Sequence, residues 1–210
     1  MKTWPMSLFL RTFLLSLLAL ASIAITPAIA ADKTAIATFA GGCFWSMQRH
    51  FDPVPGVIAT RVGYTGGPEV NPNYQQVSAE KTGHAEALEV TYDPTKTTYA
   101  KLLDVYWHYI DPTTKDGQFC DFGPSYRTAI FTHDETQMKE AEASKDAIEK
   151  SGVLKGEKIV TQIVPAGPFY AAEEYHQNFY KKNPLRYITY NLGCGREAAL
   201  KHIWGDEAGK

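Results

Sequence analysis

Apolar residues recur with two different spacings along the chain, and segments of the two kinds alternate. Short apolar or alternating runs rich in β-branched and aromatic residues are typical of strands, whereas apolar residues three and four positions apart are typical of amphipathic helices. Strands are predicted at residues 35–39, 57–64, 86–92, 126–132 and 158–164. Helices are predicted at residues 43–51, 98–110, about 134–150 and 171–181.

This order of elements predicts one α/β (α+β) domain. Turns between some strands and helices between others favour a mixed sheet with packed helices. Residues 65–74 form a loop dense in turn formers and too long for a simple hairpin, a kind of loop that often carries function. A second loop is expected at residues 111–125, and after Leu185 the tail is expected to be turn-like, with a last helical turn through Trp204.

The first thirty residues have the pattern of a signal peptide. Lys2 and Arg11 precede an apolar run at residues 12–25, and Ala28-Ile29-Ala30 has the small residues that signal peptidase requires. Cleavage before Ala31 would leave a catalytic domain at residues 31–210, exported to the periplasm or secreted. An uncleaved membrane anchor is the alternative, because the run is close to the length of a membrane span.

Composition narrows the function. Removal of the signal changes the formal charge from −2 to −4, which gives no indication of a nucleic-acid partner. The three cysteines, Cys43, Cys120 and Cys194, match no zinc spacing and form an odd number. A reactive thiol is therefore favoured over a disulfide framework. Cys120 has no apparent partner in the sequence and is interpreted as a small packing residue.

Cys43 follows two glycines at the start of a predicted helix. Unpaired backbone N–H groups and the helix dipole favour negative charge there, so the pKa of the thiol is expected to be lowered. Cys43 is thus a candidate nucleophile, with Phe44 and Trp45 as an apolar wall for a small substrate group. The alternative is a buried structural cysteine beside core aromatics.

Candidate proton donors lie near the strand ends. Glu86 lies at the start of a predicted strand, soon after Gly83. If aromatic side chains enclose the carboxyl, its pKa would rise and the neutral carboxyl could protonate a substrate oxygen. Its alternative is a solvated strand-end carboxylate. Tyr74 and Tyr126 could each donate a hydroxyl proton or simply pack, and Asp121 could serve the site or only form a turn.

Six short motifs, in this order, resemble the peptide methionine-S-sulfoxide reductase family, type A, over nearly all of residues 31–210. The motifs are Gly42-Cys43-Phe44-Trp45, Gly63-Tyr64-Thr65-Gly66-Gly67, Asn71-Pro72-Asn73-Tyr74, Thr82-Gly83-His84-Ala85-Glu86, Asp121 with Tyr126-Arg127, and Glu174-Tyr175-His176-Gln177. Two departures are Ser46, where the family usually has glycine, and Ser78-Ala79-Glu80, where cysteine is frequent. Neither removes a group that the chemistry requires.

The resemblance implies a two-layer sandwich, an α/β plait, and a sulfoxide reductase. By that resemblance Cys43 attacks the sulfoxide sulfur and Glu86 protonates the oxygen, whose departure would otherwise be slow. Phe44 and Trp45 match the pair that binds the methyl group. Tyr74 and Tyr126 match the two hydroxyls that bind the oxygen, and Asp121 matches a carboxylate that orders the site through water.

The resemblance also implies how the enzyme is recycled. Cys43 becomes a sulfenic acid, and Cys194, in a glycine-flanked tail after Asn183-Pro184, matches the recycling thiol. A Cys43–Cys194 disulfide is then expected, opened by a thioredoxin-like donor. Cys120 is not expected to be the resolving thiol, and its loop next to Asp121 leaves it as the alternate partner. We expect a monomer that uses no metal ion and no bound organic cofactor, acting on methionine sulfoxide that is free or in oxidised proteins.

Two other functions are compatible with the same residues. A thiol hydrolase would pair Cys43 with His84 or His133 as base and would need no reductant. A peptide-binding module would hold methionine side chains in its aromatic pocket and would still bind after Cys43→Ser.

Overall fold

The structure, a computed structural model, describes Met1 and residues 34–209. The predicted signal peptide at residues 1–30 lies, apart from Met1, outside the described residues. Among the described helices, none is long and apolar enough to cross a membrane.

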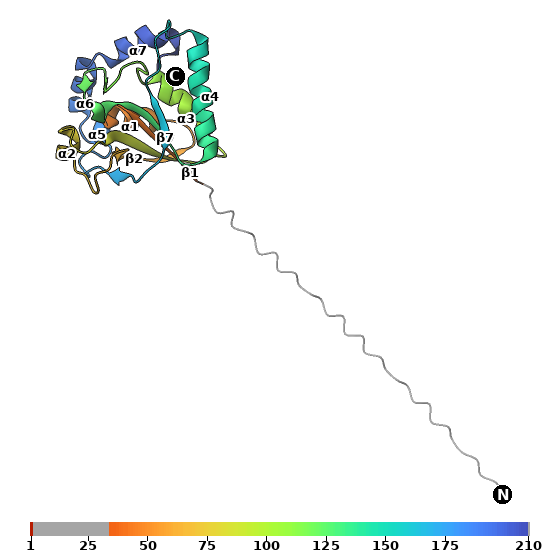
Figure 1. The fold of residues 1–210 in the computed structure, drawn as a ribbon. Coiled ribbons are helices and arrows are strands. Elements are labelled where there is room, and N and C mark those ends of the chain that lie inside the picture. Colours follow the sequence, from red (N-terminus) through yellow and green to blue (C-terminus); the bar gives the residue numbers. More distant parts are fainter. Residues whose placement is uncertain (2–33, 210) are drawn as a thin grey trace. The chain divides into compact units, whose positions relative to one another are not determined.

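The described chain alternates strands and helices, as the hydrophobic pattern predicts (Figure 1). The strands are β1 (Ala35–Gly41), β2 (Val57–Thr65), β3 (Ala85–Tyr92), β4 (Gly117–Gln118), β5 (Asp121–Phe122), β6 (Thr128–Thr132), β7 (Gln162–Pro165) and β8 (Tyr170–Ala171). The helices are α1 (Phe44–Phe51), α2 (Tyr74–Ser78), α3 (Tyr99–His108), α4 (Glu135–Ser151), α5 (Phe179–Lys182), α6 (Pro184–Gly193) and α7 (Arg196–Trp204), with short 3₁₀ helices η1 (Pro124–Tyr126) and η2 (Gly205–Glu207).

A six-stranded mixed sheet forms the centre of the fold, in the order β7-β6-β1-β3-β2-β8. Its neighbouring strands are antiparallel except for β6 and β7, which are parallel and are connected through α4. A parallel pair needs such a crossover, whereas antiparallel neighbours can be joined by turns. The predicted mixed sheet with packed helices is confirmed.

Alternation along the strands divides the core between the two faces of the sheet. In β1, Phe39 packs in the larger hydrophobic cluster, which includes residues of α1 and α3, whereas Ala40 packs in a smaller cluster. Leu88 and Ala87 of β3 divide in the same way, because successive strand side chains point to opposite faces. The larger cluster therefore fixes α1 on the face to which Leu88 points.

The C-terminal quarter differs from the prediction. The predicted helix at 171–181 is wrong: β8 ends at Ala171, turns follow, and only the short α5 is helical. The tail after Leu185 is not turn-like, since α6 begins at Pro184 and α7 follows it. Pro184 stands at the first helical position of α6, where its missing N–H costs nothing and its φ suits a helix. The loop at 111–125 also contains the β4–β5 hairpin and η1.

Candidate active site

Cys43 lies where β1 ends and α1 begins. Gly42 has φ +79°, and a Cβ at this position would lie 2.5 Å from Cβ of Gln118, so only glycine fits the turn. Cys43 is the N-cap residue of α1, and its carbonyl accepts the backbone N–H groups of Ser46 and Met47. The side chain is 6% exposed. The predicted placement of the thiol at a helix start is confirmed.

Glu86 reaches the same helix end from the sheet. It lies two positions before Leu88 and therefore on the face that α1 covers. Its Oε2 accepts the N–H of Phe44 at 3.0 Å, and the residue is 3% exposed. Burial is the largest cause that raises the pKa of Glu86, to about 8, with the charges of Asp121 and Glu80 adding to it and the Phe44 N–H opposing it. The predicted upward shift is confirmed.

The predicted fall in the pKa of Cys43 is wrong for this structure. Burial raises its pKa, as do the negative charges of Glu86 and Asp121, while the Tyr190 hydroxyl and the backbone N–H of Trp45 act in the opposite direction. The helix start also contributes less than expected, because the N–H of Phe44 is engaged by Glu86. In the substrate-free site Cys43 is therefore a neutral thiol.

Aromatic side chains, among them Trp45 and Phe44, pack beside the thiol of Cys43. Trp45 stacks on Phe179, with ring centroids 3.7 Å apart and planes 7° apart, and meets Tyr190 edge-on at 5.9 Å. Its Nε1–H donates to Nδ1 of His176 at 3.0 Å. Burial lowers the pKa of His176 to about 4, so the neutral ring can accept this proton. Phe44 is fully buried against His176, with centroids 5.0 Å apart. The geometry places an apolar surface, with Trp45 part-exposed, next to Cys43.

Tyr74 and Tyr126 come together although they are far apart in sequence. Their hydroxyls hydrogen-bond to each other, and the pKa of each is raised, first by burial and then by the charge of Glu86. The backbone N–H of Tyr74 donates to Oε1 of Glu173 at 2.8 Å, which fixes the end of the long loop. Glu173 also accepts the hydroxyl of Tyr64, the residue opposite Glu86 in the sheet. Two neutral hydroxyls thus lie near the Glu86 carboxyl.

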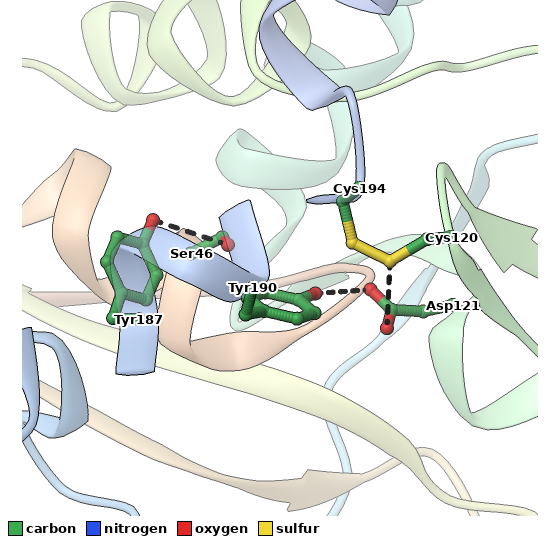
Figure 2. The surroundings of a disulfide bond; sticks show 6 residues. All are labelled: Ser46, Cys120, Asp121, Tyr187, Tyr190 and Cys194. Carbon is green, nitrogen blue, oxygen red and sulfur yellow. Dashed lines mark hydrogen bonds between the residues drawn. A yellow bond between two sulfur atoms is a disulfide. The ribbon is translucent and has the colours of Figure 1, made fainter. Parts of the chain in front are cut away.

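Asp121 lies beside Tyr190 of the C-terminal helix α6 (Figure 2). The Tyr190 hydroxyl of α6 donates to its Oδ2 at 2.5 Å. Burial raises the pKa of Asp121, while Tyr190 and the positive charge of Arg196 oppose the shift. Since the charge of Asp121 also acts on Cys43, the carboxylate belongs to the same site.

The disulfide in the structure joins Cys120 to Cys194, with Cα atoms 4.9 Å apart (Figure 2). Cys43 is a free thiol. The interpretation of Cys120 as a packing residue without a partner is wrong. The reason is the position of α6, which ends at Gly193 and brings Cys194 over the β4–β5 hairpin. The Cys120 sulfur lies 3.8 Å from Oδ1 of Asp121; in a disulfide it has no proton to donate, so this is a contact.

Sequence reasoning missed several residues of the site. Tyr190 lies in a segment expected to be turn-like, although Tyr187 and Tyr190 have the three-residue spacing of one helical face. His176 belongs to a motif that was noticed but given no role. Ser46 is fully buried, and the Tyr187 hydroxyl donates to it at 3.4 Å, so the serine is accommodated within the packing of α1.

The histidines proposed for a thiol hydrolase are engaged elsewhere. The backbone N–H of Gly67 donates to Nδ1 of His84 at 3.1 Å, and Nε2 of His84 lies 2.8 Å from the Glu69 carbonyl. Nε2 of His133 lies 2.9 Å from the Thr38 hydroxyl. Both rings hold loops or strands in place, so neither is placed to act as a base for Cys43.

Comparison with known proteins gives the same assignment as this geometry. A sequence model described as "Peptide methionine sulfoxide reductase" matches residues 35–208. The peptide methionine sulfoxide reductase MsrA of Bacillus licheniformis is 53% identical over 175 residues, which are 83% of this chain and 96% of that protein. MsrA 2 of Caulobacter vibrioides is 50% identical over 182 residues, 87% of this chain and 91% of that protein.

Solved structures agree in fold. Mxr1 of Saccharomyces cerevisiae in reduced form has a TM-score of 0.68 at 34% identity, covering 73% of this chain and 88% of that one. Methionine sulfoxide reductase A of Corynebacterium diphtheriae has a TM-score of 0.69 at 35% identity, covering 72% and 76%. The chain belongs to the peptide methionine sulfoxide reductase family, type A, and is an enzyme that reduces methionine sulfoxide.

Proposed function

We propose that this enzyme reduces the S epimer of methionine sulfoxide, free or within oxidised proteins, with Cys43 as nucleophile and Glu86 as acid. One observation carries the proposal. The Glu86 carboxyl bonds to the N–H of Phe44, the residue after Cys43, and its pKa of about 8 keeps it protonated at neutral pH. A sulfoxide oxygen is a poor leaving group until it is protonated, and a neutral carboxyl beside the nucleophile supplies that proton.

In the first step an oxygen equivalent passes from the substrate to Cys43, and two electrons pass from Cys43 to the substrate. Glu86 protonates the sulfoxide oxygen, which the hydroxyls of Tyr74 and Tyr126 hold, and the Cys43 sulfur attacks the sulfoxide sulfur after losing its proton. A bond forms between the Cys43 sulfur and the substrate sulfur while the sulfur–oxygen bond of the substrate breaks, and the oxygen leaves as water with the protons of Glu86 and Cys43. A water molecule then attacks the Cys43 sulfur and returns a proton to Glu86, the sulfur–sulfur bond breaks, and methionine leaves, reduced by two electrons. Cys43 is oxidised by two electrons to the sulfenic acid.

Substrate selection in this proposal depends on the aromatic side chains of Phe44 and Trp45. Phe44 and Trp45 contact the methyl group of the sulfoxide, while Asp121 orders the polar side of the site through Tyr190 and water. The stack of Trp45 on Phe179 supports this role, because it holds the indole rigid beside the thiol.

Recycling requires the other two cysteines. The Cys194 thiol attacks the sulfur of the Cys43 sulfenic acid, water leaves, and a Cys43–Cys194 disulfide forms. The Cys120 thiolate then attacks Cys194, a Cys120–Cys194 disulfide forms, and Cys43 leaves as thiolate. The Cys120–Cys194 bond of the structure supports this exchange, and the exposure of Cys120 makes that bond accessible to a thioredoxin-like dithiol.

We further propose that the enzyme repairs oxidised proteins outside the cytosol, as a monomer after signal cleavage at Ala31. The match to the family begins at residue 35, which leaves the signal-like segment outside the shared domain. In that location the donor dithiol must also be supplied outside the cytosol.

The test is incubation of the protein with dithiothreitol and each sulfoxide epimer separately, with methionine measured by chromatography. Because one reductase type acts on one epimer, only the S epimer should be consumed. Consumption of both epimers at similar rates, or of the R epimer alone, would refute the proposal. A peptide-binding module would instead bind oxidised peptides without consuming either epimer.

A further inference from the structure

The side chains of Cys120, Asp121 and Cys194 bring three metal-ligand atoms together. Both sulfur atoms and a carboxylate oxygen of Asp121 lie within 4.8 Å of one another. Within the part of the chain that the structure describes, no other group of three or more His, Cys, Asp or Glu side chains meets this distance. The spacing of the cysteines in the sequence gives no sign of it, because Cys120 and Cys194 are 74 residues apart. The fold therefore assembles a donor set that the sequence does not reveal.

Reduction of the disulfide converts this cluster into three anionic ligands. A reductant supplies two electrons, the sulfur–sulfur bond breaks, and each thiol can give up its proton when it binds a metal ion. Adjacent ligand atoms of a tetrahedral zinc ion are about 3.5–3.8 Å apart, since zinc–sulfur and zinc–oxygen bonds are about 2.3 Å and 2.0–2.2 Å long. The Cys120 sulfur lies 3.8 Å from Oδ1 of Asp121. This pair of atoms therefore already has the separation that zinc requires.

Cys194 has room to complete the set. Its Cα lies 4.9 Å from that of Cys120, so rotation about the Cα–Cβ bonds separates the two sulfurs once their bond is broken. A Cβ placed at Gly193 or Gly195 would meet nothing within 4 Å among the described residues, so the space beside Cys194 is open. Cys120 is exposed and Cys194 is half-buried, which gives a metal ion an entry path from solvent.

Asp121 is held in the orientation of a ligand. Its Oδ2 accepts the Tyr190 hydroxyl at 2.5 Å, which leaves Oδ1 on the side of the Cys120 sulfur (Figure 2). Carboxylates that bind metal ions are themselves hydrogen-bonded in this way, because the outer partner fixes their direction.

The donor set and its charge select zinc. Thiolates favour zinc and Cu(I), and a carboxylate oxygen favours zinc of these two. Two thiolates and a carboxylate carry three negative charges. The positive charge of Arg196, which acts on Asp121, opposes cation binding in part. One Zn²⁺ ion together with Arg196 balances the three negative charges, so the zinc-bound cluster is neutral.

We propose that the reduced Cys120 and Cys194 thiolates and the Asp121 carboxylate bind one zinc ion, with water as the fourth ligand. Two zinc–sulfur bonds and one zinc–oxygen bond form, and the two thiols release their protons to solvent. Cys43 does not belong to the set. Binding rests on the three side chains and not on the proposed reaction, for which the ion is an inhibitor and not a cofactor. Zinc holds both recycling sulfurs and so keeps Cys194 from attacking the Cys43 sulfenic acid; this consequence rests on the proposed function.

The test measures zinc binding by competition with a chromophoric chelator, on protein that has been reduced with a phosphine and then separated from it. The reduced wild type should bind one zinc ion per chain. The oxidised protein and reduced Cys120→Ser should bind at least about 100-fold more weakly, because even the loss of an outer partner of a metal ligand costs roughly 10–100-fold in affinity. Cobalt(II) in place of zinc should give thiolate-to-metal charge-transfer absorption in the reduced wild type and not in the oxidised protein.

Three further variants complete the binding test. Asp121→Asn removes a charged ligand and should weaken binding about tenfold or more, whereas Asp116→Asn removes an exposed charge from the same loop and should leave binding unchanged. Cys43→Ser should keep the wild-type affinity. Equal affinities of the reduced and oxidised protein, or an unchanged affinity in Cys120→Ser or Asp121→Asn, would overturn the proposal. Loss of binding in Cys43→Ser would place the metal on the nucleophile and overturn it as well.

A separate measurement tests the inhibition. With excess sulfoxide and no reductant, the proposed exchange gives two methionines per reduced wild-type enzyme, and saturating zinc should lower this to one. Two methionines with zinc bound would refute the inhibition. One methionine without zinc would refute the proposed recycling, while the zinc site is decided by the binding data alone.

Discussion

At the scale of single residues, burial has opposite consequences for the two groups that the proposed reaction needs. It favours the neutral form of both, which suits Glu86 as an acid and opposes Cys43 as a nucleophile. The sulfoxide removes this conflict, because a protonated sulfoxide carries positive charge next to the thiol and Glu86 becomes an anion only after giving up its proton. We expect the Cys43 thiolate to form in the substrate complex rather than in the free enzyme.

Glu86→Gln tests the acid. The amide can still accept the N–H of Phe44 but cannot deliver a proton, so single-turnover reduction should fall about 10²–10⁴-fold. In the wild type the rate should decline as pH rises through about 8, where the carboxyl loses its proton. Rapid-quench measurement of methionine release from pH 5 to 9 checks both. A Gln variant with the wild-type rate at pH 7 would remove Glu86 from the acid role.

The same substitution should affect stability with a definite sign. The folded pKa of about 8 lies above the unfolded value of 4.5, so between these pH values the native state binds more protons and stability falls as pH rises. At pH 7 the cost is roughly 3 kcal/mol, at about 1.4 kcal/mol per pKa unit. Glu86→Gln should therefore raise Tm at pH 7 and not at pH 4, as measured by calorimetry. A gain that is equal at both pH values would contradict this account.

Asp121→Asn tests the electrostatic link to Cys43. Asn can still accept the Tyr190 hydroxyl, but the negative charge that raises the pKa values of Cys43 and Glu86 is gone. Alkylation of Cys43 by iodoacetamide at pH 8 should become several-fold faster, and the decline of reduction should move to lower pH. Asp116→Asn removes an exposed charge from the same loop and should change neither. Slower alkylation in Asp121→Asn would show that the carboxylate acts in another way.

At the scale of elements, periodicity was sufficient wherever a segment packs one face on the sheet. The strand at 35–39 and the helix at 43–51 are found within two residues of their predicted ends, because their apolar faces both enter the larger core cluster. The strand predicted at 158–164 begins only at Gln162, and periodicity failed after residue 166. There Phe179 packs on Trp45 and His176 packs on Tyr74, so the spacing of these rings reflects the pocket rather than a helical stripe.

The candidate site was also predictable in part from the sequence. Cys43, Glu86 and Tyr126 stand near element ends that the pattern locates, and Tyr74 stands at the end of the predicted long loop, although the helix α2 that it begins was not predicted. The family motifs single out all four residues. Tyr190 and the pairing of Cys120 depend on where α6 lies, which is fixed by contacts between distant segments and has no local signal.

Asp134→Ala tests the N-terminal cap of α4. The Asp134 side chain accepts the N–H of Gln137 at 2.8 Å and caps α4, the helix that connects β6 to β7. Loss of this cap should destabilise the protein by about 1 kcal/mol in urea unfolding, with an unchanged m-value. Thr136 lies inside α4 and is exposed, so Thr136→Ala should be neutral or slightly stabilising. The reverse order of the two effects would contradict the observed cap.

At the scale of the whole molecule, the fold gathers three cysteines from distant parts of the chain. Cys43 follows β1, Cys120 lies in the hairpin before β6, and Cys194 follows α6, 74 residues after Cys120. Tyr190 of α6 contacts both the Asp121 carboxylate and the Cys43 thiol, so the helix that carries Cys194 also borders the nucleophile. In the proposed reaction, oxidation of the buried Cys43 thiol is passed by two exchanges to the exposed Cys120 sulfur.

This arrangement predicts the order of the disulfides. After one turnover without reductant, mass spectrometry of the wild type should find the Cys120–Cys194 link and a free Cys43, because exchange moves the bond to the exposed pair. In Cys120→Ser the bond cannot move, so a Cys43–Cys194 link should accumulate and cycling with a thioredoxin should slow. Cys194→Ser should release one methionine and then stall as the Cys43 sulfenic acid, which dimedone traps.

The control for these variants is the first turnover itself. Methionine release in the absence of reductant should be one per enzyme in Cys120→Ser and in Cys194→Ser, since neither Cys120 nor Cys194 takes part in the attack on the sulfoxide. In the wild type it should be two per enzyme, because the exchange that forms the Cys120–Cys194 disulfide frees Cys43 for a second attack. A Cys43–Cys120 link in Cys194→Ser would instead make Cys120 a direct partner of the sulfenic acid. Full cycling of Cys120→Ser at the wild-type rate would show that the donor opens the Cys43–Cys194 bond directly, and the second exchange would then have no place in the reaction.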